Sequence, residues 1–252
     1  MQNSKFAMRC PEHKPRIVIS GTYCTGKTSL SLALSLATGM PTTHAPTMRE
    51  ILPGLFPGTS LKDCSYAQLL RLGMERFERR MHAEAGLSTG FISDGCPLQE
   101  WLYGSTRLIT GAYPDENHLT MLWKKLRNYR QYQDFELLLT GFEKMAKTYA
   151  KNSYDIFFHL PVEFPFVEDG HRPTSERFRK VSEDRLLECY NELQLETIPL
   201  TGDLPERIGR ALDHLNVQPR IPIYQAISIA NEIKMKKFDQ VQLEGRVWPK
   251  SS

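Results

Sequence analysis

Residues 16–30 read RIVISGTYCTGKTSL, and this stretch decides the fold. The β-branched run at 16–20 predicts a buried strand, and the leucine-rich segment from Lys27 to about residue 37 predicts a helix. Between them, residues 21–28 match the pattern G-x-x-x-x-G-K-[S/T] at every fixed position. A glycine-bearing turn between a strand and a helix is typical of loops that bind nucleotide phosphates, with a chance match as the alternative.

The residue types of this loop suit phosphate binding. Gly21 and Gly26 carry no side chain that would block phosphate oxygens, and successive backbone N–H groups offer partial positive charge. Lys27 is expected to reach the β- and γ-phosphates, and the Thr28 hydroxyl to bind Mg²⁺. The predicted nucleotide-binding residues in this segment are Gly21, Thr22, Tyr23, Cys24, Thr25, Gly26, Lys27, Thr28 and Ser29.

Further strands alternate with helices along the chain. Short apolar runs predict strands at 40–44, 90–94, 154–160 and 196–200. Apolar periodicity predicts helices at 65–85, at 204–215 and over most of 97–150, with a break near 113–115. Five strands joined by helices predict a doubly wound, mostly parallel α/β sheet with helices on both faces.

Asp94 ends the predicted strand at 90–94. At the carboxyl edge of a parallel sheet, beside a phosphate loop, a carboxylate can hold Mg²⁺ or accept the proton of an attacking hydroxyl. The alternative is an N-cap for the helix that starts near Pro97. Gly95 follows Asp94 where ATP-driven motors usually carry a glutamate that activates water, so the sequence favours transfer to a hydroxyl over hydrolysis.

A charged segment follows the strand at 154–160. Within it, Arg172 lies just past Gly170 and is predicted to close on the transferred phosphoryl group, as part of a lid at about 166–182. Other basic residues are interpreted as solvent-exposed, namely Arg177, Arg179 and Lys180 near the lid and Arg71, Arg76, Arg79 and Arg80 on the helix at 65–85. His44 and His159 are interpreted as structural, because neither has a second ligand at metal-binding spacing.

Composition excludes several classes of protein. The 252 residues are 40% hydrophobic and 24% charged, which argues against a disordered chain. A net charge of +3 is too small to indicate nucleic acid or an anionic membrane, and no apolar run approaches the ~18 residues of a membrane span. Five cysteines without a C-x-x-C pair and a start without a secretory signal predict a cytoplasmic protein.

Three regions are predicted. Residues 1–15 form an N-terminal extension, residues 16–216 a nucleotide-binding domain, and residues 217–252 a helical tail. The tail segment from Ile223 to Phe238 predicts an amphipathic helix that packs on the core. A contact in a homo-oligomer, or a cover over the substrate, is the alternative reading of the tail.

The chain resembles the P-loop kinase domains related to ribosylnicotinamide kinase, in the group known as AAA-type ATPase domains. The resemblance covers about residues 15 to 216. It is carried by Ser20 to Thr28, by Arg49-Glu50-Ile51-Leu52, by Ser93-Asp94 with Pro97-Leu98, by Leu160-Pro161 with Phe164-Pro165 and Asp169-Gly170-x-Arg172-Pro173, and by Thr201-Gly202 with Glu206-Arg207. The family pattern is not matched at Pro46, where an acidic residue is expected, or at Gly95, where arginine often follows the aspartate.

The resemblance implies a P-loop kinase-type fold and phosphoryl transfer from ATP. It places Gly202 near the adenine, and Arg49, Glu50 and Asp94 near an acceptor bound by the region at about 45–150. The resulting hypothesis is an ATP- and Mg²⁺-dependent kinase acting on a hydroxyl of a small polar or nucleoside-like molecule, with Lys27, Asp94 and Arg172 in catalytic roles and Thr28 and Asp94 at the metal. The alternatives are a regulatory ATP-binding module that engages a protein partner and, with less support, a nucleic-acid-binding ATPase.

Overall fold

The computed structural model describes residues 14–61, 63–110, 123, 125–164 and 175–246, with side chains through residue 236. Its centre is a five-stranded parallel sheet in the order β2-β3-β1-β4-β5. The strands are β1 (Arg16–Ser20), β2 (Thr42–Thr43), β3 (Phe91–Asp94), β4 (Ile156–His159) and β5 (Thr197–Pro199). The predicted five-stranded α/β sheet is therefore confirmed.

Successive side chains of the central strands point to opposite faces of the sheet, so the core has two layers. Ile17 and Ile19 of β1 point to one face and Val18 to the other, and all three are fully buried. In β4, Phe158 packs with Ile17 and Ile19, whereas Phe157 packs with Val18. A strand buried on both sides reads as a continuous apolar run, because both faces need hydrophobic partners.

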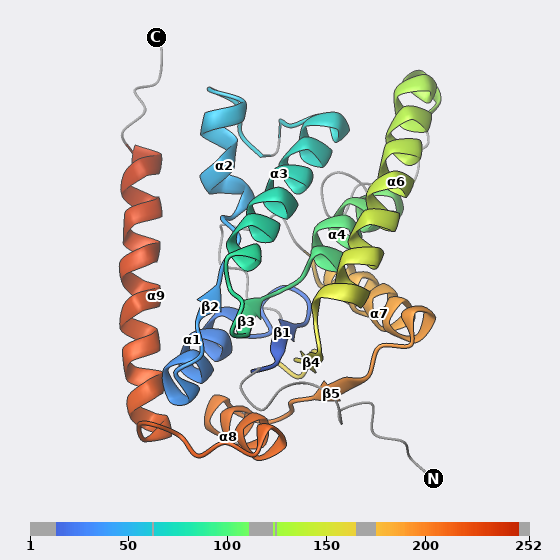
Figure 1. Ribbon diagram of the computed structural model, residues 1–252. Helices are drawn as coiled ribbons and strands as arrows, with labels where there is room; N and C mark the ends of the chain where they lie inside the picture. The colour runs from blue at the N-terminus through green and yellow to red at the C-terminus, as the bar shows by residue number, and fades with distance from the viewer. Residues whose placement is uncertain (1–13, 62, 111–122, 124, 165–174, 247–252) are drawn as a thin grey trace.

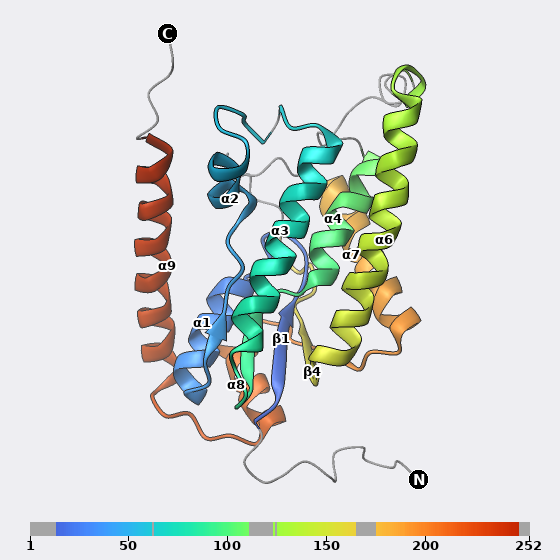
Figure 2. The ribbon, with the colours of Figure 1, turned by 45° about the horizontal axis from the view of Figure 1, so that its top comes forward.

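Helices cover both faces of the sheet (Figures 1 and 2). One face carries α1 (Lys27–Thr38), α8 (Leu204–Leu215) and α9 (Ile223–Arg246), whose apolar residues form one cluster. The other face carries α3 (Tyr66–Ala85), α4 (Pro97–Thr110), α6 (Tyr129–Ser153) and α7 (Glu176–Leu193), whose aromatic residues form a second cluster. Helix α2 (Met48–Leu55) packs on α3 through a smaller cluster that includes Ile51 and Leu72.

Three helices differ from the prediction. Helix α2 was not predicted, because it has only eight residues and contains Pro53, but a Thr47–Glu50 capping box defines its start. Helix α7 begins at Glu176, inside the segment assigned to the lid. Helix α9 continues past Phe238 to Arg246 and packs along α1 and α8, as the core-packing interpretation of the tail requires.

No helix in the described part of the chain is both long enough and apolar enough to cross a lipid bilayer.

Candidate functional site

The phosphate-binding loop lies at the carboxyl edge of the sheet, between β1 and α1. Gly21 has φ +141°, and a Cβ atom there would lie 2.6 Å from the carbonyl oxygen of Leu160. The amide of Leu160 donates to Ser20 O at 2.8 Å, so the ends of β1 and β4 lie close together at this point. Only glycine fits this approach, which explains the first glycine of the motif.

Hydrogen bonds within the loop hold it as a compact turn. The hydroxyl of Thr25 donates to the carbonyl oxygen of Thr22 at 3.1 Å, and the ammonium of Lys27 donates to the same oxygen. Gly26 is in the left-handed region, with φ 93°, and forms the N-cap of α1. The ammonium of Lys27 therefore lies against the loop, where it is predicted to contact the phosphates of a bound nucleotide.

The structure brings Thr28 and Asp94 together. Strand β3 pairs with β1 so that Asp94 lies opposite Ile19, one strand away from the loop. The Thr28 hydroxyl donates to Asp94 Oδ2 at 2.7 Å, and His44 Nδ1 lies 3.1 Å from the same oxygen. A hydroxyl and a carboxylate oxygen are hard ligands of the kind that Mg²⁺ prefers, so the two residues fit the predicted metal contact.

The surroundings of Asp94 keep its carboxyl group ionised. Burial by itself raises the pKa, but hydrogen bonds from His44 and Thr28 and the charges of His44 and Lys27 outweigh it and lower the pKa to about 2. A carboxylate with so low a pKa is a weak proton acceptor and a strong electrostatic partner for a cation. Its environment therefore suits metal binding and orientation better than proton removal.

The cap interpretation of Asp94 finds no support in the contacts at the start of α4. There the side-chain oxygen of Gln99 accepts the amide of Cys96 at 2.9 Å, whereas the carboxylate of Asp94 contacts Thr28 and His44. Gln99 also donates to the carbonyl oxygen of Gly21, so one buried side chain joins the start of α4 to the phosphate loop.

Gly95 departs from the family pattern for a steric reason. Its φ is +84°, and a Cβ atom would lie 2.5 Å from Oε1 of Gln99. Arg80 lies on the same side, since its Nη2 would be 3.5 Å from that Cβ. The left-handed backbone and the close contact with the buried Gln99 therefore disfavour a side chain at position 95.

Two arginines of α3 correct the expectation of a solvated face. Arg80 is 2% exposed and donates from Nη1 to the carbonyl oxygens of Asp94 at 3.1 Å and Gly95 at 3.0 Å. Its Nη2 pairs with Glu100 Oε1 at 2.9 Å. Arg76 pairs with Glu100 Oε2 at 2.5 Å and is 18% exposed. Buried guanidinium groups need such partners, and these support the backbone beneath Asp94.

The interpretation of α3 as a solvated face holds only for its outer arginines. The side chains of Arg71 and Arg79 are 58% and 49% exposed, and both pair with Glu75 of the same helix.

Tyr23 joins the loop to the opposite layer of helices. Its ring stacks on Tyr103 of α4, with centroids 4.1 Å apart and planes at 21°, and lies 5.8 Å from the ring of Phe178 in α7. Because aromatic pairs of this geometry add to ordinary apolar burial, the stack fixes the loop against α4 and α7.

Cys24 is a candidate site for chemical labelling of the loop. It is partly exposed, whereas Cys64, Cys96 and Cys189 are buried. We expect alkylation of Cys24 by N-ethylmaleimide to block ATP binding, because the adduct would fill the phosphate loop, and we expect Mg-ATP to slow the labelling. Peptide mass spectrometry with and without Mg-ATP measures this, with Cys24→Ala as the control. Equal labelling of Cys24 at saturating ATP would contradict the placement of phosphates in this loop.

The remaining predicted binding residues are Gly202, Glu50, Arg49 and Ser29, and each makes different contacts. The amide of Gly202 donates to Glu163 Oε2 at 3.0 Å, next to Arg207. Glu50 accepts the amide of Thr47 at 2.5 Å in the capping box of α2, and Arg49 is an exposed residue of the same helix. A role for Arg49 or Glu50 at an acceptor stays a prediction. Ser29 accepts a hydrogen bond from Lys234 of α9 at 3.2 Å.

The predicted lid is described only in its second part. Arg172 lies outside the described residues, so its catalytic role stays a prediction. The solvated interpretation is wrong for Arg179, which is 2% exposed and donates to Phe164 O at 2.6 Å, because α7 turns this side chain inward. It is confirmed for Arg177 and Lys180, which are exposed.

His159 pairs with Glu183 at 2.8 Å in the buried layer beside the loop. This contact is in keeping with the structural interpretation of His159.

Sequence reasoning missed three residues that contact the phosphate loop or Asp94, namely His44, Gln99 and Arg207. A signal existed for His44, because it directly follows β2, and β2 neighbours β3, whose carboxyl end carries Asp94. The spacing of metal ligands does not reveal it, because His44 contacts a carboxylate on a neighbouring strand. Arg207 entered only as part of the motif that carries the resemblance, and Gln99 did not enter at all, because residue spacing does not reveal hydrogen bonds to backbone carbonyls.

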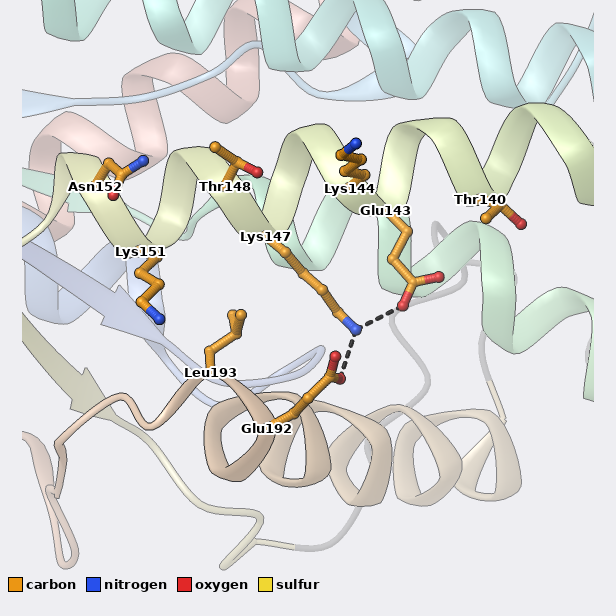
Figure 3. A pocket seen from close by; sticks show the side chains of 9 residues that line it. All are labelled: Thr140, Glu143, Lys144, Lys147, Thr148, Lys151, Asn152, Glu192 and Leu193. Atoms are coloured by element: carbon orange, nitrogen blue, oxygen red, sulfur yellow. Dashed lines mark hydrogen bonds and ion pairs between the residues drawn. The ribbon is translucent and has the colours of Figure 1, made fainter.

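An open hollow of about 460 Å³ lies elsewhere, between α6 and α7 (Figure 3). At its rim, Lys147 pairs with Glu143 at 2.6 Å and with Glu192 at 2.5 Å. The residues that line it include none of the predicted site residues. The hollow is therefore separate from the phosphate loop.

Solved structures share this fold. NadR protein in complex with NAD and AMP-PNP matches with a TM-score of 0.55 and 15% identity, over 83% of this chain and 51% of that chain. Deoxyadenosine kinase from M. mycoides with bound dATP matches with a TM-score of 0.52 and 16% identity, over 81% of this chain and 100% of that chain. The chain thus spans about half the length of NadR, and at such identities the likeness shows the fold alone.

No curated protein matches the chain. A family model described as an AAA domain matches residues 16–207, which is most of the sequence and includes the phosphate loop, Asp94 and Arg207. The chain therefore belongs to this AAA domain family, with a fold of the P-loop kinase type.

Proposed function

We propose that the protein is an ATP- and Mg²⁺-dependent kinase that transfers the γ-phosphate to a hydroxyl of a small polar or nucleoside-like molecule. The observation that carries the proposal is the 2.7 Å hydrogen bond between Thr28 of the loop and Asp94 of β3. It places a hydroxyl and an ionised carboxylate together beside a phosphate-binding turn, which is the donor set of a magnesium nucleotide site.

The residues of the site have distinct roles in this proposal. The loop from Gly21 to Thr28 binds the phosphates through its amides, and Lys27 contacts the transferred group. Thr28 and Asp94 would hold Mg²⁺, which supplies charge neutralisation between the phosphates. Asp94 also orients the acceptor hydroxyl, and Arg172 belongs to the lid.

The residue that follows Asp94 favours transfer over water activation. Asp94 is followed by Gly95, and the carbonyls of both residues are held by the buried Arg80. ATP-driven motors usually carry a glutamate at the position of Gly95 to activate water, and this chain does not. The pKa of Asp94, at about 2, makes it a weak proton acceptor, so its proposed roles are to hold charge and to position groups.

Solved relatives of the fold support the substrate class. They include a deoxyadenosine kinase with bound dATP and NadR protein in complex with NR. From that likeness we carry over the class of acceptor, a nucleoside or similar polar molecule, and no individual compound. The cytoplasm, where ATP and such acceptors meet, is the proposed location.

A second candidate is a regulatory ATP-binding module whose tail engages a protein partner. The observation that favours it is the contact between Lys234 of α9 and Ser29 in the first turn of α1, at 3.2 Å. Through this contact the tail helix touches the residue that follows Thr28. A change at the phosphates could therefore reach the tail.

Acceptor-dependent release of ADP separates the two candidates. We expect at least one member of a panel of nucleosides, sugars and hydroxy-amino acids to accelerate ADP release from Mg-ATP and to gain the mass of one phosphoryl group. A regulatory module predicts slow ADP release that no acceptor changes. The same mixture without Mg²⁺ is the control, and ADP release that is indifferent to every acceptor would contradict the kinase proposal.

A further inference from the structure

Arg207 makes a buried contact with the phosphate loop although it lies 182 residues after Thr25 in the sequence. It lies in α8, is 4% exposed, and donates from Nη1 to the carbonyl oxygen of Thr25 at 2.8 Å. The start of α8 is set by an Asp203–Glu206 capping box, so the position of the next residue, Arg207, is also set. The guanidinium group therefore approaches the loop from a fixed helix.

The second arm of the same guanidinium binds a different loop. Arg207 Nη2 donates to Glu163 Oε2 at 2.7 Å, and that oxygen also accepts the amide of Gly202 at 3.0 Å. The hydrogen bond from Arg207 is the main reason that the pKa of Glu163 is lowered. The guanidinium carbon lies 5.4 Å from the ring centre of Phe164. Its two arms and one face are engaged, so the group cannot rotate freely.

The direction of the Thr25 carbonyl has a consequence for the next amide. In a trans peptide the C=O and N–H groups point in opposite directions. A donor that holds Thr25 O on the α8 side therefore directs the N–H group of Gly26 to the opposite side. Gly26 has φ 93° and no side chain, so the hydrogen bond from Arg207 is well placed to hold that peptide in one orientation.

We infer that Arg207 is a positioning residue for ATP: it orients the Thr25–Gly26 peptide so that the Gly26 amide faces the phosphates, and through Glu163 it links that peptide to the loop at Gly202. The inference rests on the proposed nucleotide site. Arg207 acts through the backbone of Thr25 and through Glu163, and not by binding phosphate itself. It thereby couples three loops, those after β1, β4 and β5. The coupling is electrostatic and depends on a forked donor, which lysine does not provide.

The test is ATP affinity, measured by calorimetry with Mg-ATP on folded protein well below its melting temperature. Hydrogen bonds to charged groups contribute enough for Arg207→Met to weaken ATP binding about 10- to 100-fold. The ATP affinity of Arg207→Lys should lie between those of Arg207→Met and wild type, because an ammonium reaches one acceptor but not both. Glu163→Gln should weaken ATP binding less than Arg207→Met does. In the double variant the two losses of binding free energy should not add fully.

Arg79→Met is the control. Arg79 is an exposed arginine of α3 that pairs with Glu75 of the same helix at 3.0 Å, so this variant removes a similar side chain and leaves Thr25, Glu163 and the loop at Gly202 unchanged. Its ATP affinity should stay within about 2-fold of wild type, as is usual for surface changes. A merely structural role for Arg207 would lower the melting temperature and leave the ATP affinity of the folded protein unchanged.

The outcomes separate the inference from the proposed function. Wild-type protein that binds no ATP contradicts both. Wild-type protein that binds ATP, with Arg207→Met binding equally tightly, overturns the inference alone. If Arg207→Met does not fold, Arg207→Lys and Glu163→Gln decide: weaker binding by either folded variant supports the inference, and unchanged binding by both overturns it.

Discussion

Lys27→Ala is expected to lower the rate of phosphoryl transfer on the order of 10²-fold or more. The ammonium of Lys27 lies on the phosphate loop, where it contacts Thr22 O, and its charge is the one that the motif brings to the transferred group. Removing it takes away stabilisation that is greatest when charge develops on the γ-phosphate oxygens. The measurement is kcat and KM for ATP at a saturating concentration of an acceptor identified in the panel.

The fold of Lys27→Ala should be intact, because the side chain is partly exposed and its ammonium contacts only a loop carbonyl among the hydrogen bonds described here. Lys151→Ala is the control, since Lys151 is an exposed lysine of α6 at the hollow away from the loop. Turnover near the wild-type value for Lys27→Ala, with any acceptor, would remove the phosphate loop from the mechanism.

Asp94→Asn should retain ATP binding and lose nearly all transfer. Asparagine keeps the shape and an oxygen that can accept from Thr28, but it loses the charge that His44, Thr28 and Lys27 stabilise. An amide holds Mg²⁺ and its waters poorly, and it does not orient an acceptor hydroxyl as a charged carboxylate does. We therefore expect the rate of transfer to fall on the order of 10²-fold or more. Most phosphate contacts come from the loop, so ATP affinity should change far less than the rate.

Calorimetry, thermal melting and acceptor phosphorylation on one sample of Asp94→Asn distinguish the possible roles. Asp213→Asn, at an exposed position of α8, controls for the substitution itself. If Asp94 were only a helix cap, asparagine would replace it with little effect on stability or activity. Normal phosphorylation by Asp94→Asn would therefore take Asp94 out of the mechanism and direct attention to Glu50.

The sequence predicts the sheet and the loop well because both depend on local patterns. A β-branched run, a glycine-bearing turn and a leucine-rich helix define β1, the loop and α1, and the spacing of later apolar runs defines the other strands. Thr28 and Asp94 were predictable as neighbours because parallel strands present their carboxyl ends at one edge of the sheet.

The residues that support the site were less predictable. Arg80 and Arg179 look like surface arginines in sequence, but partners distant in sequence, Glu100 for one and Phe164 O for the other, make their burial possible. Arg207 binds Thr25, which lies 182 residues earlier in the sequence. Such contacts depend on tertiary geometry, and helix or strand periodicity carries no information about them.

The most direct test of the kinase proposal is where the γ-phosphate goes. With ATP labelled in the γ-phosphate, Mg²⁺ and the acceptor panel, the account predicts that label appears in a phosphate ester of one acceptor, one phosphoryl group for each ADP formed. It also predicts that Lys27→Ala and Asp94→Asn abolish that product. Label found only in inorganic phosphate, at a rate independent of every acceptor, would contradict the account.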